Sequence, residues 1–322
     1  MQRKDMQTKR VLVAIAAALI ACGLVPDSST AQERKVRIAF ANVNDESSFG
    51  AIVLRGVRAA AKQRPDIQMI YYDNKSDAAR SVENARAAAV VRPDVYIGYN
   101  GTPATNPQIA RVLRDAQIPI LSVQTRVPDT PIFAVDNALA GYEACRRLSQ
   151  EAKRRWGAKP PVIFLLTFPE GGPLFVERSD ACKRAMAEEL PGTPIQEQST
   201  KNDTGHARAV TTDFLTRNAK QKVIIWAHVD SMAIAAVTAA RNSSREGDLL
   251  MSATGGEAAV LPEIRKVNGT YIGTFSFFPE NWGQDILELA VKIARKQSVP
   301  EVTRPAKQVF VTRENIDELY PR

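Results

Sequence analysis

The sequence contains few of the residues from which metal centres and nucleophilic active sites are built. Only two of its 322 residues are histidines, His206 and His228, and neither lies at metal-ligand spacing from the other or from a cysteine. The sequence has no glycine-rich dinucleotide motif, phosphate loop, zinc-protease motif or nucleophile elbow. These absences argue against an enzyme, and we expect no catalytic residue, no metal and no cofactor.

Long basic runs are also missing. The formal net charge is +8, of which +6 remains when residues 1–31 are set aside, and the basic residues are scattered. Proteins that follow a phosphate backbone concentrate their positive charge, so we do not expect nucleic-acid binding. With 44% hydrophobic residues, the chain is globular and long enough to divide into two lobes.

The first segment has the pattern of a secretory signal. A cationic stretch at residues 1–10 precedes a fifteen-residue apolar run at 11–25 and a short polar stretch that ends at Ala31. The apolar run is shorter than the roughly 20 residues that span a bilayer. We therefore predict that residues 1–31 are a signal peptide, cleaved before Gln32.

The three cysteines leave two questions open. Residues 19–22 resemble a lipobox, which would make Cys22 a lipid anchor, but the apolar run continues past Cys22 and favours soluble release. After cleavage the chain keeps Cys145 and Cys182, an even pair in a compartment that permits disulfides. They are either bridged or two small buried thiols.

From residue 36 onward, short apolar runs alternate with longer segments of helical period, which indicates repeated β-α units and a parallel sheet. The rhythm restarts after Asn137, so we expect two α/β lobes of similar construction, each with helices on both faces of its sheet. The predicted strands are 36–41, 67–72, 94–98, 118–123, 162–167, 195–199, 223–227 and 249–253. The predicted helices are 52–63, 77–91, 107–116, 141–156, 174–190, 206–218 and 231–241.

Polar loops follow the predicted strands, at the sheet edge where ligands of open α/β sheets bind. They are rich in Asn, Asp, Ser, Thr and Gly, with Phe49, Phe168, Arg126 and Arg178 close by, which suits a pocket for a small polar ligand. His228 follows a strand in the same way, and an ordinary loop histidine is the alternative. The loops are 42–49, 73–77, 100–102, 124–126, 168–172, 202–204, 228–230 and 254–257.

Several short motifs occur in an order typical of a known family. They are Ile38-Ala39-Phe40 before an Asn-rich loop and Ser48-Phe49, Ile118-Pro119-Ile120, Asp136-Asn137 before Gly141, Asp230-Ser231-Met232-Ala233, and Val311-Thr312-Arg313-Glu314-Asn315-Ile316. In this order the chain, over roughly residues 35–322, resembles the type 1 periplasmic binding proteins of the ribose-binding group.

The resemblance implies an α/β fold of two similar doubly wound parallel-sheet lobes joined by a three-crossing hinge. The crossings are expected near 135–137, 276–278 and 300–306. Lobe 1 would comprise 34–135 plus 277–300, and lobe 2 would comprise 137–276 plus 306–322.

The resemblance also implies a function. The chain would be a monomeric, periplasmic solute-binding component of an ABC importer, which closes around a small-molecule ligand and presents it to the permease. Phe49 would stack on the ligand, and Arg178 would donate hydrogen bonds to it. The other expected ligand contacts are Asn42, Asn44, Asn100, Gln124, Arg126, Asp136, Phe168, His228, Asp230, Thr254 and Phe277.

Some positions depart from the sugar-binding pattern. Gln124 stands where the group carries an aspartate, Val229 replaces an asparagine, Thr254 an aspartate and Phe277 a glutamine. Each lost partner of a buried sugar hydroxyl costs about 1 to 3 kcal/mol. The departures indicate a less hydroxylated, more apolar or anionic ligand rather than a simple pentose or hexose.

Other functions remain as alternatives. A periplasmic sensor subunit that docks on a receptor kinase or chemoreceptor would have the same fold and pocket. A secreted enzyme on this fold is disfavoured by the missing catalytic motifs. A sugar-responsive repressor would need a helix-turn-helix at the N-terminus, where the signal stands.

Overall fold

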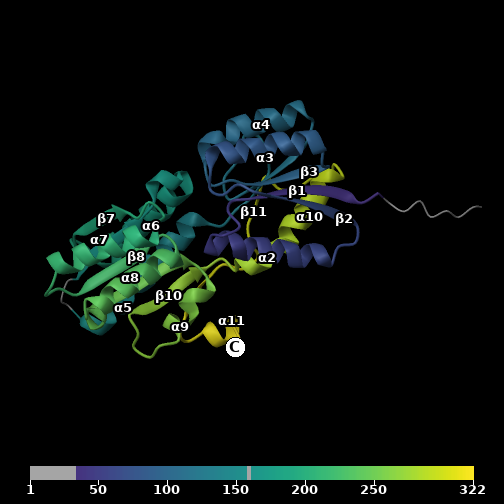
Figure 1. Ribbon diagram of the computed structural model, residues 1–322. Helices are drawn as coiled ribbons and strands as arrows, with labels where there is room; N and C mark the ends of the chain where they lie inside the picture. The colour runs from purple at the N-terminus through teal and green to yellow at the C-terminus, as the bar shows by residue number, and fades with distance from the viewer. Residues whose placement is uncertain (1–33, 158–160) are drawn as a thin grey trace, which may run out of the picture. The chain divides into compact units, whose positions relative to one another are not determined.

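The computed structural model describes residues 34–157 and 161–322. The predicted signal peptide, its cleavage before Gln32 and the alternative anchor at Cys22 lie outside the described residues. Residues Lys35–Arg322 form one compact unit that contains two six-stranded sheets, each with its own helices (Figure 1). The predicted fold class, two similar α/β lobes, is confirmed.

The sheet of lobe 1 is parallel throughout, in the order β11-β5-β4-β3-β1-β2. Its central strands are nearly continuous buried runs, as expected for strands covered on both faces. Its strands are β1 (Val36–Asn42), β2 (Ile67–Asp73), β3 (Val95–Tyr99), β4 (Ile120–Val123), β5 (Ile132–Phe133) and β11 (Val302–Thr303).

Two pairs of helices cover the two faces of this sheet (Figure 1). Along β1, Ile38 and Phe40 face the core under α2 and α10, whereas Ala39 and Ala41 face the core under α3 and α4. Helix α10 comes from much later in the sequence, so lobe 1 is built from separate segments. The helices are α2 (Ser48–Lys62), α3 (Ala78–Val91), α4 (Asn106–Asp115) and α10 (Trp282–Ala294).

The sheet of lobe 2 has the order β12-β10-β9-β8-β6-β7 and is parallel except for its edge strand β12, which runs antiparallel to β10. The segments of β10, β12 and α10 were not predicted from the sequence. The strands are β6 (Val162–Thr167), β7 (Ile195–Ser199), β8 (Val223–Ala227), β9 (Leu249–Gly255), β10 (Tyr271–Ser276) and β12 (Val309–Thr312).

Helices α5 and α6 cover one face of the second sheet, and α7 and α8 cover the other. The longer helices are α5 (Asn137–Trp156), α6 (Pro173–Glu189), α7 (Thr204–Arg217) and α8 (Asp230–Asn242), and two short ones are α9 (Leu261–Ile264) and α11 (Ile316–Leu319). Single 3-10 turns occur at η1 (Pro103–Thr105), η2 (Pro169–Gly171), η3 (Glu246–Asp248), η4 (Ala258–Val260) and η5 (Pro279–Asn281).

Helices α2 and α5 each begin four residues earlier than predicted because a polar residue caps them. The Ser47 side chain accepts a hydrogen bond from the Gly50 amide, so α2 begins at Ser48 rather than at residue 52. The Asp136 side chain accepts from the Leu139 amide, so α5 begins at Asn137 rather than at residue 141. Apolar periodicity alone misses such a first turn.

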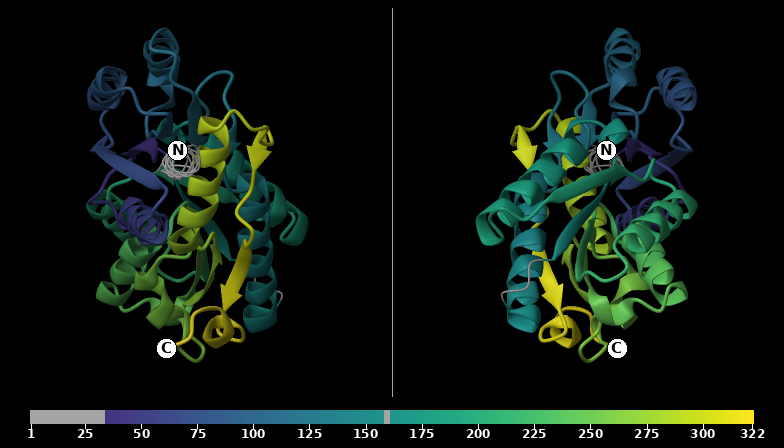
Figure 2. Two further views of the ribbon diagram at one scale, coloured as in Figure 1. Left: turned by 90° about the vertical axis from the view of Figure 1, so that its right-hand side faces the viewer. Right: turned by 90° about the vertical axis from the view of Figure 1, so that its left-hand side faces the viewer.

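The chain crosses between the sheets three times, after β5, after β10 and after β11 (Figure 2). The first and third crossings are bonded to each other, since the Asp136 amide donates to Gln308 Oε1 at 2.8 Å and Arg304 Nη1 donates to the Val135 carbonyl. The residue bounds predicted for the lobes stay a prediction.

A disulfide joins the two helices on one face of the second sheet. Cys145 of α5 and Cys182 of α6 are bonded, with their Cα atoms 5.1 Å apart, and both residues are fully buried. The sequence allowed either a disulfide or two separate buried thiols, and the structure contains the disulfide.

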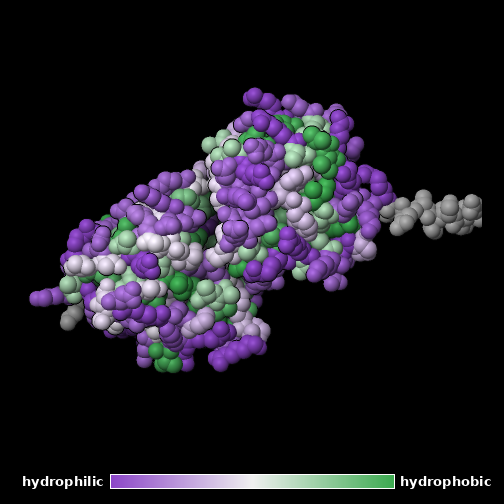
Figure 3. Space-filling model, in the orientation of Figure 1, coloured by the Kyte–Doolittle hydropathy of each residue, from purple (hydrophilic) through white to green (hydrophobic). Residues whose placement is uncertain are grey.

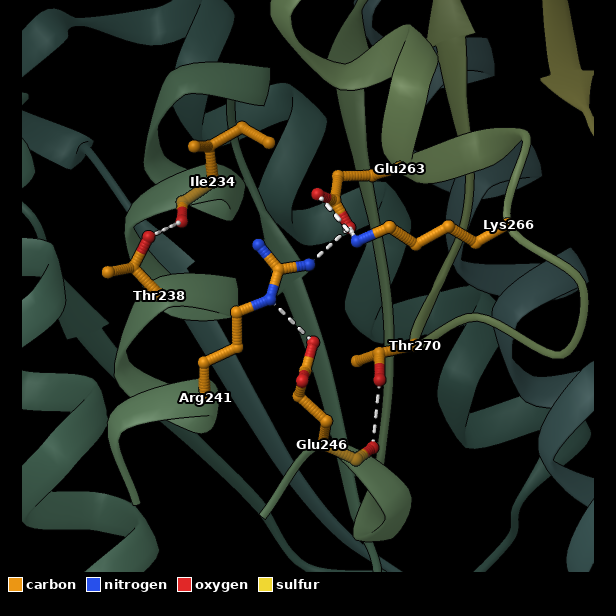
Figure 4. A network of polar contacts seen from close by, with 7 residues as sticks. All are labelled: Ile234, Thr238, Arg241, Glu246, Glu263, Lys266 and Thr270. Carbon is orange, nitrogen blue, oxygen red and sulfur yellow. Dashed lines mark hydrogen bonds and ion pairs between the residues drawn. The ribbon is translucent and has the colours of Figure 1, made fainter. Parts of the chain in front are cut away.

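Ion pairs tie the turn η3, which precedes β9, and helix α9, which precedes β10, to α8 (Figure 4). Arg241 Nε lies 2.8 Å from Glu246 Oε1, and its Nη2 lies 2.7 Å from Glu263 Oε2, which also pairs with Lys266. Because several of these side chains are partly exposed, each pair stabilises the fold only weakly.

The face of the molecule drawn in Figure 3 is largely hydrophilic, with apolar residues in small groups. The exposed large apolar side chains of the described residues are few, for example the neighbours Val90 and Val91 on α3 and Val267 in lobe 2, which is normal for a globular protein. Within residues 34–157 and 161–322, no helix is long and apolar enough to cross a membrane.

Candidate functional site

A cavity of about 330 Å³ lies where residues of both lobes meet at the carboxyl ends of the parallel strands. Its volume falls at the lower end of the range for small-molecule sites, roughly 300 to 1,000 Å³. Each of the eight loops selected from the sequence contributes at least one lining residue, for example Val43, Ser76, Gly101, Thr125, Gly171, Asn202, Val229 and Gly255.

A larger cavity of about 600 Å³ lies at the opposite end of lobe 2, between the second half of α5 and the start of β10. Its lining residues come from lobe 2 alone, and two of its arginines, Arg154 and Arg155, are paired with Glu151. We take the smaller cavity as the site because parallel strands place their ligands at their carboxyl ends.

Aromatic side chains from both lobes line the cleft. The Phe49 ring packs edge-on against Trp282, with ring centroids 5.4 Å apart, and against Phe277 at 6.3 Å. Tyr99 at the end of β3 and Phe175 on α6 also line the cleft. Flat rings of this kind cover the apolar faces of a ligand.

Arg178 of α6 is the cation of the cleft and is almost fully buried. Its Nε and Nη2 donate to Asn137 Oδ1, and its Nη1 donates to the His228 carbonyl at 2.7 Å and to Thr254 Oγ1 at 2.9 Å. The guanidinium also lies 5.1 Å from the Phe277 ring centre and 5.4 Å from that of Phe175. These contacts hold the group in one orientation.

One N–H group of the Arg178 guanidinium has no acceptor among these protein groups. A guanidinium carries five N–H donors, and the protein groups above occupy both hydrogens of Nη1, one of Nη2 and that of Nε. Within the described residues, no carboxylate forms an ion pair with Arg178, and burial lowers its pKa to about 10. A buried cation with an unused donor is suited to an acceptor atom of a ligand.

Two of the predicted contacts lie behind Arg178 instead of lining the cleft. His228 is fully buried, and its Nδ1 lies 3.2 Å from the Leu166 carbonyl. Burial lowers the pKa of His228 to about 3, so its ring is neutral. Thr254 belongs to strand β9 rather than to a loop, and its hydroxyl accepts from Arg178 and donates to the His228 carbonyl. Both residues position Arg178.

Asp230 is also placed behind the cleft surface. Its Oδ1 accepts from the hydroxyls of Tyr271 and Thr274, and its Oδ2 accepts from the amides of Gly256 and Glu257. Four donors to one fully buried carboxylate leave no free capacity for a ligand. Burial raises the pKa of Asp230, and the four hydrogen bonds act against that rise. Since two of the donors are amides of the loop after β9, Asp230 holds that loop in place.

The turn after β9 depends on glycine. Gly255 and Gly256 have φ values of +144° and +89°, and a Cβ on Gly256 would lie 2.1 Å from Ser276 Oγ. This conformation directs the amides of Gly256 and Glu257 at Asp230 Oδ2 and brings the Glu257 side chain to the cleft.

The remaining predicted contacts divide into two groups. Phe49, Asn100, Gln124, Arg178 and Phe277 line the cleft. The amide nitrogen of Asn100 is already bonded to Thr102, Thr105 and Asn106 within lobe 1. By contrast, Gln124 Nε2 is buried and has no hydrogen-bond partner.

Asn42, Asn44, Arg126, Asp136 and Phe168 are not among the lining residues. Asn42 Nδ2 bonds Asp45 and the Gly50 carbonyl, Asn44 Oδ1 accepts from the amides of residues 46 and 47, and Asp136 caps α5. Arg126 donates to the Thr130 carbonyl and pairs with Glu301, and Phe168 packs on Phe175 and His228. Because their side chains are bonded to or packed on protein groups outside the cleft lining, we assign these residues to the support of the cleft loops, although Asn42 Oδ1 is buried without a hydrogen-bond partner.

Several lining residues were not predicted. Tyr99 and Phe175 each lie within three residues of a predicted site residue or loop, and the strand-end rule extended by one helical turn would have included them. Trp282 belongs to α10, for which no helix was predicted. Glu257 lies at the end of a predicted loop but was not singled out.

The comparisons with known proteins agree with this geometry. Residues 38–298 match the profile of the family described as periplasmic binding protein domain. No protein with a curated functional description matches the sequence.

Solved structures share the fold. An ABC transporter solute binding protein from Bacillus halodurans with bound myo-inositol is 16% identical, with a TM-score of 0.79 over 89% of this chain and 98% of that chain. One from Actinobacillus succinogenes with bound D-allose is 25% identical, with a TM-score of 0.78 over 88% and 100%. One from Mycobacterium smegmatis with bound glycerol is 20% identical, with a TM-score of 0.81 over 89% and 98%.

Proposed function

The chain belongs to the periplasmic binding protein family, and we propose that it captures a small polar solute between its lobes and delivers it to the permease of an ABC importer. The main support for this proposal is the cleft of about 330 Å³, which residues of both lobes line at the carboxyl ends of their strands. The family is one of substrate-binding proteins, so the chain is not an enzyme.

Ligand capture follows from the placement of the contacts. Phe49, Tyr99 and Trp282 belong to lobe 1, whereas Arg178 and Glu257 belong to lobe 2. A solute that touches both sets favours the closed arrangement of the lobes by its differential affinity for that state. The three crossings between the sheets are the hinge about which the lobes would close.

The ligand class is supported by the relatives, which hold myo-inositol, D-allose and glycerol. All three are neutral polyhydroxyl compounds, and we propose a solute of that general kind for this chain. The cleft has fewer polar side chains than the sugar-binding pattern, so a ligand with some apolar surface is favoured.

We propose export through the N-terminal signal, release into the periplasm after cleavage before Gln32, and a monomer that docks on the permease. N-terminal sequencing of the periplasmic fraction should begin at Gln32, and acylation at Cys22 would replace soluble release with membrane anchoring.

A thermal-shift screen tests the ligand proposal. The purified protein is heated with myo-inositol, D-allose, glycerol, amino sugars and sugar acids, and a ligand that binds only the folded state raises the melting temperature. At a ligand concentration about 100 times Kd, the gain in folding free energy is about 2.7 kcal/mol. A screen in which no solute raises the melting temperature would contradict solute capture in this cleft.

A further inference from the structure

Glu257 is an ionisable side chain of the cleft to which the sequence pattern and the family resemblance assign no role. It is only 2% exposed, it lines the cleft, and its Oε2 has no hydrogen-bond partner. Among the described lining residues it is the one carboxylate, and Arg178 is the one side chain with a full positive charge. A buried carboxylate oxygen without a donor is costly, which indicates that a donor arrives from elsewhere.

The groups around Glu257 decide which donor is missing. The Ser48 hydroxyl of lobe 1 and the Ser231 amide of lobe 2 lie close enough to stabilise the carboxylate. The charge of Asp230 opposes ionisation, although the oxygens of Asp230 are fully occupied by its own four donors. None of these groups occupies Oε2.

The other ionisable groups near this loop do not supply the donor either. Tyr271 donates its hydroxyl to Asp230, and the Tyr320 hydroxyl lies 2.6 Å from Ser276 Oγ. Arg178 is held by protein groups on the side of Asn137 and His228. Tyr99 on β3 also lines the cleft, but its hydroxyl is not bonded to Glu257, since Oε2 has no hydrogen-bond partner.

We propose, on the basis of the proposed function, that Glu257 contacts the ligand and selects a solute that donates a hydrogen bond to Oε2 from a hydroxyl or amino group. A second atom of the same solute accepts a hydrogen bond from the unused N–H of Arg178. The chemical class is therefore a neutral polyol or an amine-bearing analogue. A sugar acid, which would bring a third carboxylate beside those of Glu257 and Asp230, is excluded from this position, and a neutral or amine-bearing ligand replaces the anionic ligand that the sequence left open.

Ionisation of Glu257 gives this contact a pH dependence. Burial, with a smaller contribution from the charge of Asp230, raises the pKa of Glu257 to about 7. A ligand hydroxyl donates a stronger hydrogen bond to the carboxylate than to the neutral acid. Since Glu257 is already buried, the ligand removes little further water from it. Affinity therefore rises with pH through neutrality, by about tenfold between roughly pH 6 and 8.

Isothermal titration calorimetry on the purified protein tests the contact. The probes are myo-inositol, D-allose, D-glucosamine and D-glucuronate, each titrated at pH 6 and 8. Binding of the best neutral or amine-bearing probe should weaken roughly tenfold to a hundredfold in Glu257→Gln, and the pH dependence should disappear. Glu257→Asp should bind weakly but keep a pH dependence. The matched control Glu46→Gln, in an exposed position of a cleft loop, should match the parent.

The possible outcomes separate the two proposals. If a probe binds the parent but Glu257→Gln binds it equally well with an unchanged pH profile, the assignment of Glu257 is wrong and solute capture stands. If D-glucuronate binds more tightly than the neutral probes, the ligand class is wrong. If no probe binds the parent, both the solute class and the proposed capture of such solutes are overturned. Circular dichroism melts show whether each variant is folded.

Discussion

Asn137 Oδ1 accepts hydrogen bonds from both Nε and Nη2 of Arg178, at 3.2 and 2.7 Å. Asn137 is the first residue of α5 and Arg178 lies on α6, so the contact ties the helix after the first crossing to the cation of the cleft. The sequence pointed to the preceding residue, Asp136, as a ligand contact. The structure shows that Asp136 begins the helix and that Asn137 orients the arginine.

Replacing Asn137 by alanine should free the guanidinium and weaken ligand binding about tenfold or more. The variant also leaves two buried N–H groups without an acceptor, so it should lose about 1 to 3 kcal/mol of folding free energy. Calorimetric titration and urea melts measure the two effects. Asn218→Ala, which removes a side chain that bonds the Phe214 carbonyl at the end of α7, is the control and should leave ligand affinity unchanged.

Gly141→Ala should disturb the same helix pair. A Cβ on Gly141 would lie 1.9 Å from the main-chain oxygen of Arg178, so α5 and α6 would have to separate. We expect a loss of roughly 1 to 3 kcal/mol in folding free energy, together with weaker ligand binding because Arg178 shifts. Gly247→Ala, where no atom lies within 4 Å of the added Cβ, is the matched control. Equal melting temperatures for the two variants would contradict the close approach of the helices.

Removing the disulfide should lower stability without removing the site. The bridge between Cys145 and Cys182 closes a loop with a sequence separation of 37 residues, for which chain entropy gives about 3 to 4 kcal/mol. The Cys145→Ala/Cys182→Ala double variant should melt at a lower temperature and should still bind the ligand at reduced temperature. The parent protein should lose a similar amount on addition of reductant, whereas the double variant should not respond.

Folding stability should depend on pH through Glu257. Its pKa in the unliganded fold is about 7, above the ordinary glutamate value, so the folded state holds a proton that the unfolded state has released. The unliganded protein should therefore lose stability as pH rises from about 4.5 to 7, by on the order of 3 kcal/mol from this group. Urea melts of the parent and of Glu257→Gln isolate the effect. Parallel pH profiles for the two proteins would contradict the raised pKa.

Much of the site could be predicted from strand order alone. Because parallel strands end at one edge of their sheet, their order alone predicts that the loops with Phe49, Asn100 and Gln124 lie at the cleft. The polar loops indicated only that Arg178 lies close to the cleft, and its role as a donor to the ligand was implied by the family resemblance. The fold class follows from the same rhythm of apolar runs and helical segments.

The rest depended on tertiary contacts that periodicity does not encode. Trp282 reaches the cleft from a segment that returns to lobe 1 after β10, and no local pattern indicates where such a segment packs. Glu257 reaches it because two glycines with positive φ turn the chain after β9. His228 and Asp230 have the residue types of ligand contacts, but their partners in the fold occupy them.

The most direct test of solute capture compares the two walls of the cleft, Phe49 of lobe 1 and Arg178 of lobe 2, in calorimetric titrations with the best solute of the thermal-shift screen. Phe49→Ala and Arg178→Lys should each weaken binding about tenfold or more while the protein stays folded, because the ligand must touch both lobes. Arg147 stacks on Phe310 of lobe 2, away from the cleft, and the control variant Arg147→Lys should bind the solute like the parent. Binding of parental strength in both cleft variants would contradict capture between the lobes.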